Sequence, residues 1–272
     1  MTKRLYDLDS HQTETQSTVL SCTAVEDKFD VVLDQTVFFP KAADNPPTLE
    51  RWAAQPFCTC ARKTARSTTV DHALKIGESV SGTIDWTRRF DLMQQHTGEH
   101  LLSFSFYDLF QASNVGFHLA LDYATIDFDK PVSREEIKEA ELLANRFVWK
   151  NLPVQATFYE DEAEVAALPL RKHAEGLQPP IRIVHVEGAD MCTCCAPHCY
   201  TTGEIRLRVR SGCQQLQGRY AHHVFLRRAG VEAPSRAARR PRRHRAAFLL
   251  PEGGCDRRGQ KTFGRFRRAQ EE

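Results

Sequence analysis

The chain has 272 residues, of which 41% are hydrophobic and 26% charged, with a formal net charge of +2. This balance is typical of globular proteins, and the length fits one large domain or two ordinary ones. No run of about 18 apolar residues occurs, so no membrane-spanning helix is predicted. The polar start, MTKRLYDLDSHQ, lacks the apolar core of a secretion signal, which predicts a cytoplasmic protein.

The first third of the chain has the pattern of a small β domain. STVLSCTAV and DVVLDQTVFF alternate apolar and polar residues on either side of the turn-like EDKF, which predicts strands within residues 17–40. Residues 40–69 lose this periodicity, and strand and turn signals return in VDHALKIGESVSGTID. We therefore predict a β-barrel domain over residues 1–84 that is disrupted at 41–69.

The middle of the chain alternates helical and strand patterns. Asp85 is a candidate N-cap for a helix, and Ser133 with Glu136 forms a capping box for a second one. NVGFHLALDYATIDFD, residues 114–129, is typical of a hairpin, and LPVQATFYE, IRIVHVEG and TTGEIRLRVR are expected strands. We predict an α+β domain over residues 85–210, which makes the fold class α+β.

The end of the chain differs in charge from the rest. Residues 206–272 hold 17 Arg and 1 Lys against 5 acidic side chains, a net charge of +13, so the preceding residues carry −11. Residues 211–272 are expected to be a disordered Arg-rich tail. Such a tail can attract phosphates without sequence preference, although accidental charge explains it better.

Two residue pairs have the spacing of metal ligands. His96 and His100, in HTGEH, lie four apart on a predicted helix and so face the same way. Cys194 and His198, in MCTCCAPHCY, are also four apart, and Pro197 favours a loop or strand end there. Three imidazoles and one thiolate make an ordinary tetrahedral zinc shell, so we predict Zn²⁺ bound by these four residues.

The other cysteines leave alternatives open. Cys192, Cys195 and Cys199 are either alternative ligands or small buried residues. A redox protein using Cys194 and Cys195 is a weaker interpretation, because adjacent cysteines lack the C-x-x-C spacing of thioredoxin-like sites, although Cys192 and Cys195 have it.

Three segments resemble a known family. RRFDLMQQHTGEHLLS, NVGFHLALDYATIDFD and CCAPHCYTTGEI are similar to the AlaX-type alanyl-tRNA editing proteins and to the editing domain of alanyl-tRNA synthetase. The resemblance implies a small β-barrel followed by a zinc-binding editing domain, and its zinc ligands match His96, His100, Cys194 and His198. It also implies the removal of serine or glycine wrongly attached to tRNA for alanine. The family usually has small residues and Thr where this chain has Ala196 and Pro197.

The implied reaction is the hydrolysis of an ester on the terminal ribose of tRNA. Zinc either polarises the carbonyl and activates a water, or positions the 3′ end while another group directs the water. Thr97 and Glu99 are candidate catalytic residues. Thr36, in DQTVFF, is a candidate substrate-binding hydroxyl, because a hydrogen-bonding partner can distinguish serine from alanine.

Two segments suggest shifted reading frames. The family's glycine-rich loop should follow VFFP, where this chain has KAADNPPTLERW. One legal codon choice for that segment reads GGGQPADTGTL when two bases are skipped. We hypothesise a compensated shift over about residues 41–69 and an open one from about residue 206. The C-x-C pair Cys58 and Cys60 then has no metal role.

Two functions remain in competition. The first is a zinc-dependent aminoacyl-tRNA deacylase whose activity is impaired by the altered segments. The second is a non-catalytic, zinc-stabilised remnant that binds tRNA. Deacylation of Ser-tRNA for alanine distinguishes them.

Overall fold

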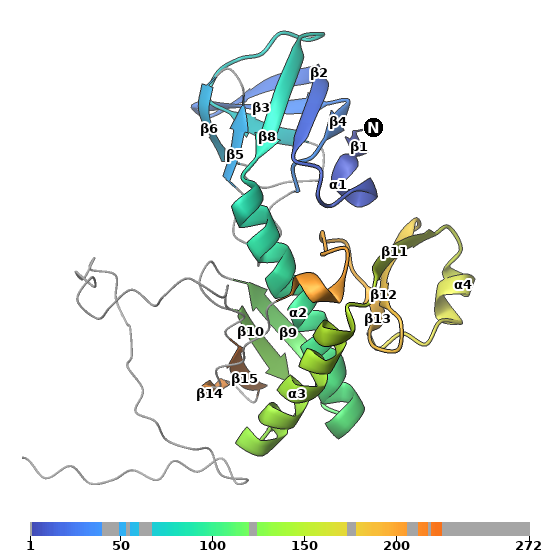
Figure 1. The fold of residues 1–272 in the computed structure, drawn as a ribbon. Coiled ribbons are helices and arrows are strands. Elements are labelled where there is room, and N and C mark those ends of the chain that lie inside the picture. Colours follow the sequence, from blue (N-terminus) through green and yellow to red (C-terminus); the bar gives the residue numbers. More distant parts are fainter. Residues whose placement is uncertain are drawn as a thin grey trace, which may run out of the picture.

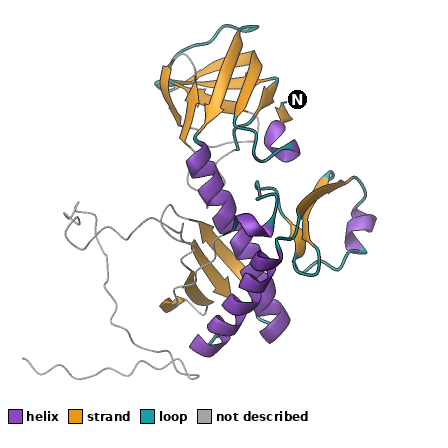
Figure 2. Cartoon of the chain, in the orientation of Figure 1, coloured by secondary structure: helices purple, strands orange, loops and turns teal. Residues whose placement is uncertain are grey.

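The computed structural model describes residues 2–39, 49–52, 55–59, 67–119, 124–172, 178–205, 212–216 and 219–224. Within these ranges the chain forms an α+β fold with four hydrogen-bonded sheets and two long helices (Figure 1). The expected fold class is therefore confirmed. One group of strands forms the end of the molecule above the start of α2, and smaller groups of strands lie on both sides of the two long helices (Figure 2).

The N-terminal part is a six-stranded sheet in the order β6-β5-β8-β2-β3-β7. Its residues alternate between a buried face, with Val19, Val31 and Leu33, and an exposed one, as the sequence predicts. Glu26, at a φ of 56°, turns β2 into β3. The strands are β2 (Glu14–Val25), β3 (Lys28–Leu33), β5 (Leu49–Trp52), β6 (Gln55–Thr59), β7 (Ser67–Val70) and β8 (Ser79–Ile84).

Closure of this sheet into a barrel stays a prediction, since the hydrogen-bonded order given above ends at β6 and β7 in the part of the chain described. The segment expected to be disrupted, residues 41–69, contains β5, β6 and the start of β7. Backbone pairing needs no particular side-chain pattern, so strands form there without the usual alternation. The residues around these strands, where the glycine-rich loop was expected, lie outside the described ranges.

A short N-terminal segment ties this sheet to the rest. β1 (Lys3–Arg4) pairs in parallel with β4 (Gln35–Thr36), and α1 (Leu5–Leu8) follows directly. Residues 9–13 then run toward the loop that contains His198 before β2 begins. The side chain of Ser10 donates a 2.7 Å hydrogen bond to the carbonyl of His198, across 188 positions of sequence.

Helix α2 (Trp86–Phe110) connects the two parts of the molecule (Figure 1). It begins where the sequence predicts, because Asp85 accepts a hydrogen bond from the backbone of Arg88 at 3.1 Å. Helix α3 (Arg134–Lys150) has the predicted capping box between Ser133 and Glu136. The two helices pack together in one core. No described helix has the length and apolar character needed to cross a membrane.

The predicted hairpin of residues 114–129 is present as β9 (Asn114–Leu119) and β10 (Ala124–Phe128), which pair antiparallel. Beyond β10 the sheet continues with β15 (Arg219–Val224) and β14 (Gly212–Leu216). These two strands lie in the tail that was expected to be disordered. The open edge of β10 supplies backbone partners for them, which the charge composition of the tail does not reveal.

A three-stranded sheet lies on the other side of α2 and α3 (Figure 1). Its order is β11-β12-β13, with β11 (Val154–Tyr159), β12 (Ile181–Val186) and β13 (Met191–Thr193), and α4 (Glu162–Ala166) follows β11. The strand expected at TTGEIRLRVR is wrong at its start. Thr201 and Glu204 form a capping box around the 3₁₀ turn η1 (Thr202–Glu204), and residues 206–210 lie outside the described ranges.

Candidate metal centre

Helix α2 presents two histidines on one face, and the first of them contacts β9. His96 and His100 are one turn apart, and their ring centroids lie 5.0 Å from each other. Phe117, on β9, stacks on the His96 ring at 5.8 Å with an interplanar angle of 18°. This stacking contact helps to fix the orientation of the His96 ring.

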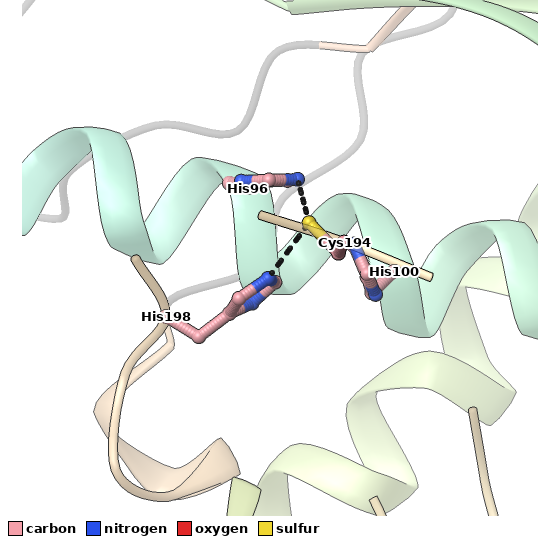
Figure 3. A group of neighbouring side chains, drawn as sticks. All are labelled: His96, His100, Cys194 and His198. Atoms are coloured by element: carbon pink, nitrogen blue, oxygen red, sulfur yellow. Dashed lines mark hydrogen bonds between the residues drawn. The ribbon is translucent and has the colours of Figure 1, made fainter. Parts of the chain in front are cut away.

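The other two residues come from the loop after β13. Cys194 and His198 lie against the two histidines of α2, with the Cys194 sulfur between the rings of His96 and His198 (Figure 3). Arg182, on β12, donates hydrogen bonds to the carbonyls of Cys194 at 2.8 Å and Ala196 at 3.0 Å. The loop is therefore held to the sheet on both sides of Cys195, next to Pro197.

The separations of these atoms fit a tetrahedral metal ion. One ligand atom from each of the four residues lies within 4.8 Å of all the others. The Cys194 Sγ atom is 3.6 Å from His96 Nε2 and 3.4 Å from His198 Nε2. Tetrahedral zinc, with bonds of about 2.3 Å to sulfur and 2.05 Å to nitrogen, separates such a pair by about 3.6 Å. The residues present thus fit zinc in both type and spacing.

His100 is oriented by a buried ion pair. Its Nδ1 atom lies 2.9 Å from Asp190 Oδ2, which leaves Nε2 to face the centre. Arg171 donates two hydrogen bonds to the same carboxylate, from Nε at 2.6 Å and from Nη2 at 3.0 Å. Asp190, His100 and Cys192 also form a compact group of possible ligands. Because Arg171 already occupies both oxygens of Asp190, this group supports the centre rather than forming a second one.

His198 is oriented by Thr97. The Thr97 hydroxyl donates to the Met93 carbonyl at 2.8 Å and accepts from the Cys199 backbone at 3.2 Å. It also lies 3.1 Å from His198 Nδ1. With its one proton directed at Met93, the hydroxyl accepts a hydrogen bond from the Nδ1–H group of His198. This leaves His198 Nε2 unprotonated and facing Cys194.

The protonation states of the loop ligands suit metal binding. Burial disfavours the thiolate of Cys194, but electrostatic attraction by His96 and hydrogen bonding from His100 outweigh it, and the pKa of the thiol lies well below its usual range. Burial lowers the pKa of His198 to about 3, so the ring is neutral near pH 7. Thiolate and neutral imidazole are the forms that bind zinc.

Comparison with known proteins agrees with this arrangement. The chain is 33% identical over 223 residues to the alanyl-tRNA editing protein AlaX-M of Methanosarcina barkeri, covering 76% of this chain and 90% of that protein. The chain belongs to the alanyl-tRNA editing protein family. It is also 30% identical over 213 residues to AlaX-L of Pyrococcus horikoshii and 29% identical over 237 residues to Aarsd1 of Bos taurus. These matches cover 75% and 80% of this chain.

Relatives in the alanyl-tRNA editing family differ in length. The chain spans about half of AlaX-L and of the bovine Aarsd1, 53% in each case. No family model matches the chain.

The side chains of two predicted site residues, Glu99 and Thr36, make their hydrogen bonds outside the four-residue cluster. Glu99 is buried, and its Oε1 atom accepts hydrogen bonds from Ser103 at 2.5 Å and Asn114 at 2.6 Å. Thr36 is buried in the N-terminal sheet region, where its hydroxyl accepts from the Phe38 backbone at 3.1 Å. Among the described residues no hydrogen bond joins Thr36 to the metal ligands.

The sequence did not single out Asp190, Arg171 or Arg182. A carboxylate two positions before Cys192 is a usable signal, because a metal-bound histidine commonly donates a hydrogen bond from its second ring nitrogen to a carboxylate. Nothing in the sequence pairs Arg171 with it, since the pairing depends on how the loop before β12 returns to β13. Of the remaining cysteines, Cys192 and Cys199 are buried, as the simpler interpretation expects, and Cys195 is exposed.

Proposed function

We propose that the chain hydrolyses the ester linking serine or glycine to a wrongly charged tRNA for alanine, with zinc held by His96, His100, Cys194 and His198. The observation that carries this proposal is the four-residue cluster with tetrahedral spacing, in a chain that belongs to the alanyl-tRNA editing family. The closed N-terminal β-barrel and the cytoplasmic location, where charged tRNA is used, belong to the same proposal.

When bound, zinc supplies a positive charge that polarises a carbonyl or acidifies a water. The chain's own residues do the rest. Asp190 and Thr97 hold the protons on the outer nitrogens of His100 and His198, so the inner nitrogens stay available. The negative charge of Cys194 lowers the net charge of the centre, and Phe117 covers one side of His96. This set of contacts keeps the centre rigid while a substrate enters.

The hydrogen bonds of Thr97 and Glu99 favour positioning roles for both. The hydroxyl of Thr97 has its proton and both lone pairs engaged, so it is not available to a substrate water. Glu99 is turned toward Ser103 and Asn114, where it anchors α2 to the start of β9. We propose that Thr36 hydrogen-bonds to the serine hydroxyl of the substrate, and this proposal rests on the family resemblance alone.

Deacylation of Ser-tRNA and Gly-tRNA for alanine by the purified chain, with zinc content measured on the same sample, tests the proposal. We expect about one zinc per chain, and release of serine that is abolished in His96→Ala. His72→Ala is the matched control, because His72 lies in the N-terminal region away from the cluster, and this variant should keep both properties.

The competing function has a distinct outcome. A chain that binds zinc and tRNA but releases no amino acid is the non-catalytic remnant. Unchanged zinc content in His96→Ala contradicts both functions, because both require the same four ligands.

A further inference from the structure

An aromatic cluster lies next to the metal centre and has no part in binding the metal. Tyr200 follows the ligand His198 by two residues, and its ring stacks on His11 with centroids 3.6 Å apart and planes inclined by 19°. His11 in turn contacts Trp86 at 5.0 Å and Phe90 at 6.0 Å, both in the first turns of α2. The cluster therefore gathers three segments: the N-terminal strand connection, the start of α2 and the ligand loop.

The Tyr200 ring is held in place from several directions. Its hydroxyl donates to the carboxylate of Asp9, which also accepts from the His11 backbone at 2.8 Å. Glu204 accepts from the Tyr200 backbone at 2.9 Å through one oxygen and lies 2.9 Å from His11 Nε2 through the other. The ring is thus fixed before any ligand arrives, which removes most of the entropic cost of ordering it on binding.

Despite these contacts, Tyr200 remains 48% exposed. One face of the ring is covered by His11, so the exposed area lies on the remaining side. A rigid aromatic ring with an open side is an element that proteins use to stack unpaired nucleobases. Serine and glycine offer no ring to such a surface, so the amino acid part of the proposed substrate does not account for it.

We propose that Tyr200, backed by His11, is the stacking platform for the base of the 3′-terminal nucleotide of the substrate tRNA. This inference rests on the proposed function. The ester to be cleaved is on the terminal ribose, so the base on that same ribose comes closest to the metal centre. Two residues of chain span at most about 7 Å, which keeps Tyr200 beside His198. The Ser10 bond to the His198 carbonyl fixes the platform to the centre.

Fluorescence of a modified tRNA tests the platform without requiring hydrolysis. The probe is uncharged tRNA for alanine whose terminal adenine is replaced by 2-aminopurine, which loses fluorescence when it stacks. With zinc-loaded protein we expect quenching on binding to the wild type and to Tyr200→Phe, which keeps the ring and loses only the Asp9 bond. Tyr200→Leu should abolish the quenching and weaken binding roughly 5- to 150-fold, the range found for loss of one stacked base.

Tyr107→Leu is the matched control. Tyr107 is 37% exposed and lies 21 positions after Trp86 on α2, about 30 Å along the helix axis. This variant should bind and quench like the wild type. Zinc content is measured on every variant, and Tyr200→Phe reports on the ring itself if Tyr200→Leu loses its metal.

The outcomes separate the platform from the proposed reaction. Quenching by the wild type that is lost in Tyr200→Leu, with no release of serine by either, supports the platform and contradicts the deacylase. Release of serine with equal quenching and equal affinity in the wild type and Tyr200→Leu overturns the platform and leaves the deacylase intact. Absence of quenching in the wild type also overturns the platform.

Discussion

The buried ion pair behind His100 makes a quantitative prediction. In Asp190→Asn the carboxylate becomes a neutral amide, while the guanidinium of Arg171 stays in place with only 7% of its side chain exposed. Removing one partner from a buried pair leaves the other charge uncompensated and costs about 3–5 kcal/mol. Loss of a hydrogen-bond partner behind a metal-binding histidine weakens metal affinity about 10- to 100-fold. Asp190→Asn should therefore lower both stability and zinc affinity.

Two measurements separate these effects. Urea unfolding of the metal-free protein gives the stability change, and competition with a chromogenic chelator gives the zinc affinity. The matched control is Asp71→Asn, which makes the same substitution in a surface pair. Asp71 and Lys28 are 3.6 Å apart, with 53% and 38% of their side chains exposed, so the free energy of unfolding should change by no more than about 1 kcal/mol.

Equal unfolding free energies in Asp190→Asn and Asp71→Asn would refute the idea that Asp190 compensates a buried charge. Loss of stability with unchanged zinc affinity would refute its role in orienting His100. The two parts of the reasoning are thus tested independently by one pair of variants.

Three further predictions concern other parts of the chain. The pKa of His198 is lowered to about 3, so the folded metal-free protein takes up fewer protons than the unfolded chain below about pH 6.5, and stability falls on acidification by up to about 1.4 kcal/mol per pH unit. Unfolding midpoints between about pH 6.5 and 4 should fall less steeply in His198→Asn, and equal slopes contradict this. Ser133→Ala removes the capping box of α3 and should cost about 1 kcal/mol in urea unfolding; an unchanged midpoint means that the cap contributes nothing. Finally, sequencing the coding DNA around codons 41, 69 and 206 should show a second frame that encodes a glycine-rich loop, and DNA unable to encode one rules out the shifted-frame explanation.

Local signals predicted much of the fold. Asp85 and Ser133 mark the starts of α2 and α3, because an N-cap side chain acts on backbone groups two or three residues away. The hairpin of β9 and β10 follows from alternation within one short segment. His96 and His100 are four residues apart, a spacing that places both side chains on the same face of a helix. This shared face could be predicted from sequence alone.

Long-range contacts could not be predicted in the same way. The pairing of Arg171 with Asp190 depends on the return of the chain through β12 and β13, and the Ser10 bond to His198 joins residues 188 positions apart. Ligand chemistry suggested that the two pairs bind one metal ion, and the family resemblance supported this combination, but neither pair alone identifies its partner. Local signals can also mislead. The β-branched residues of TTGE predicted a strand, but hydrogen bonds between Thr201 and Glu204 close a turn there instead.

Helix α2 makes the structure sensitive to insertions between its first turns and His96. Arg89, in its first turns, donates to the carbonyl of Val37 at 3.0 Å, and His96 lies seven residues further along the same helix. The helix therefore fixes the angle about its axis between the Arg89 hydrogen bond and the candidate metal ligands. Inserting one residue between Arg89 and His96 would turn one region about 100° against the other. A change in the length of α2 between Arg89 and His96 should therefore disturb the structure more than a substitution there.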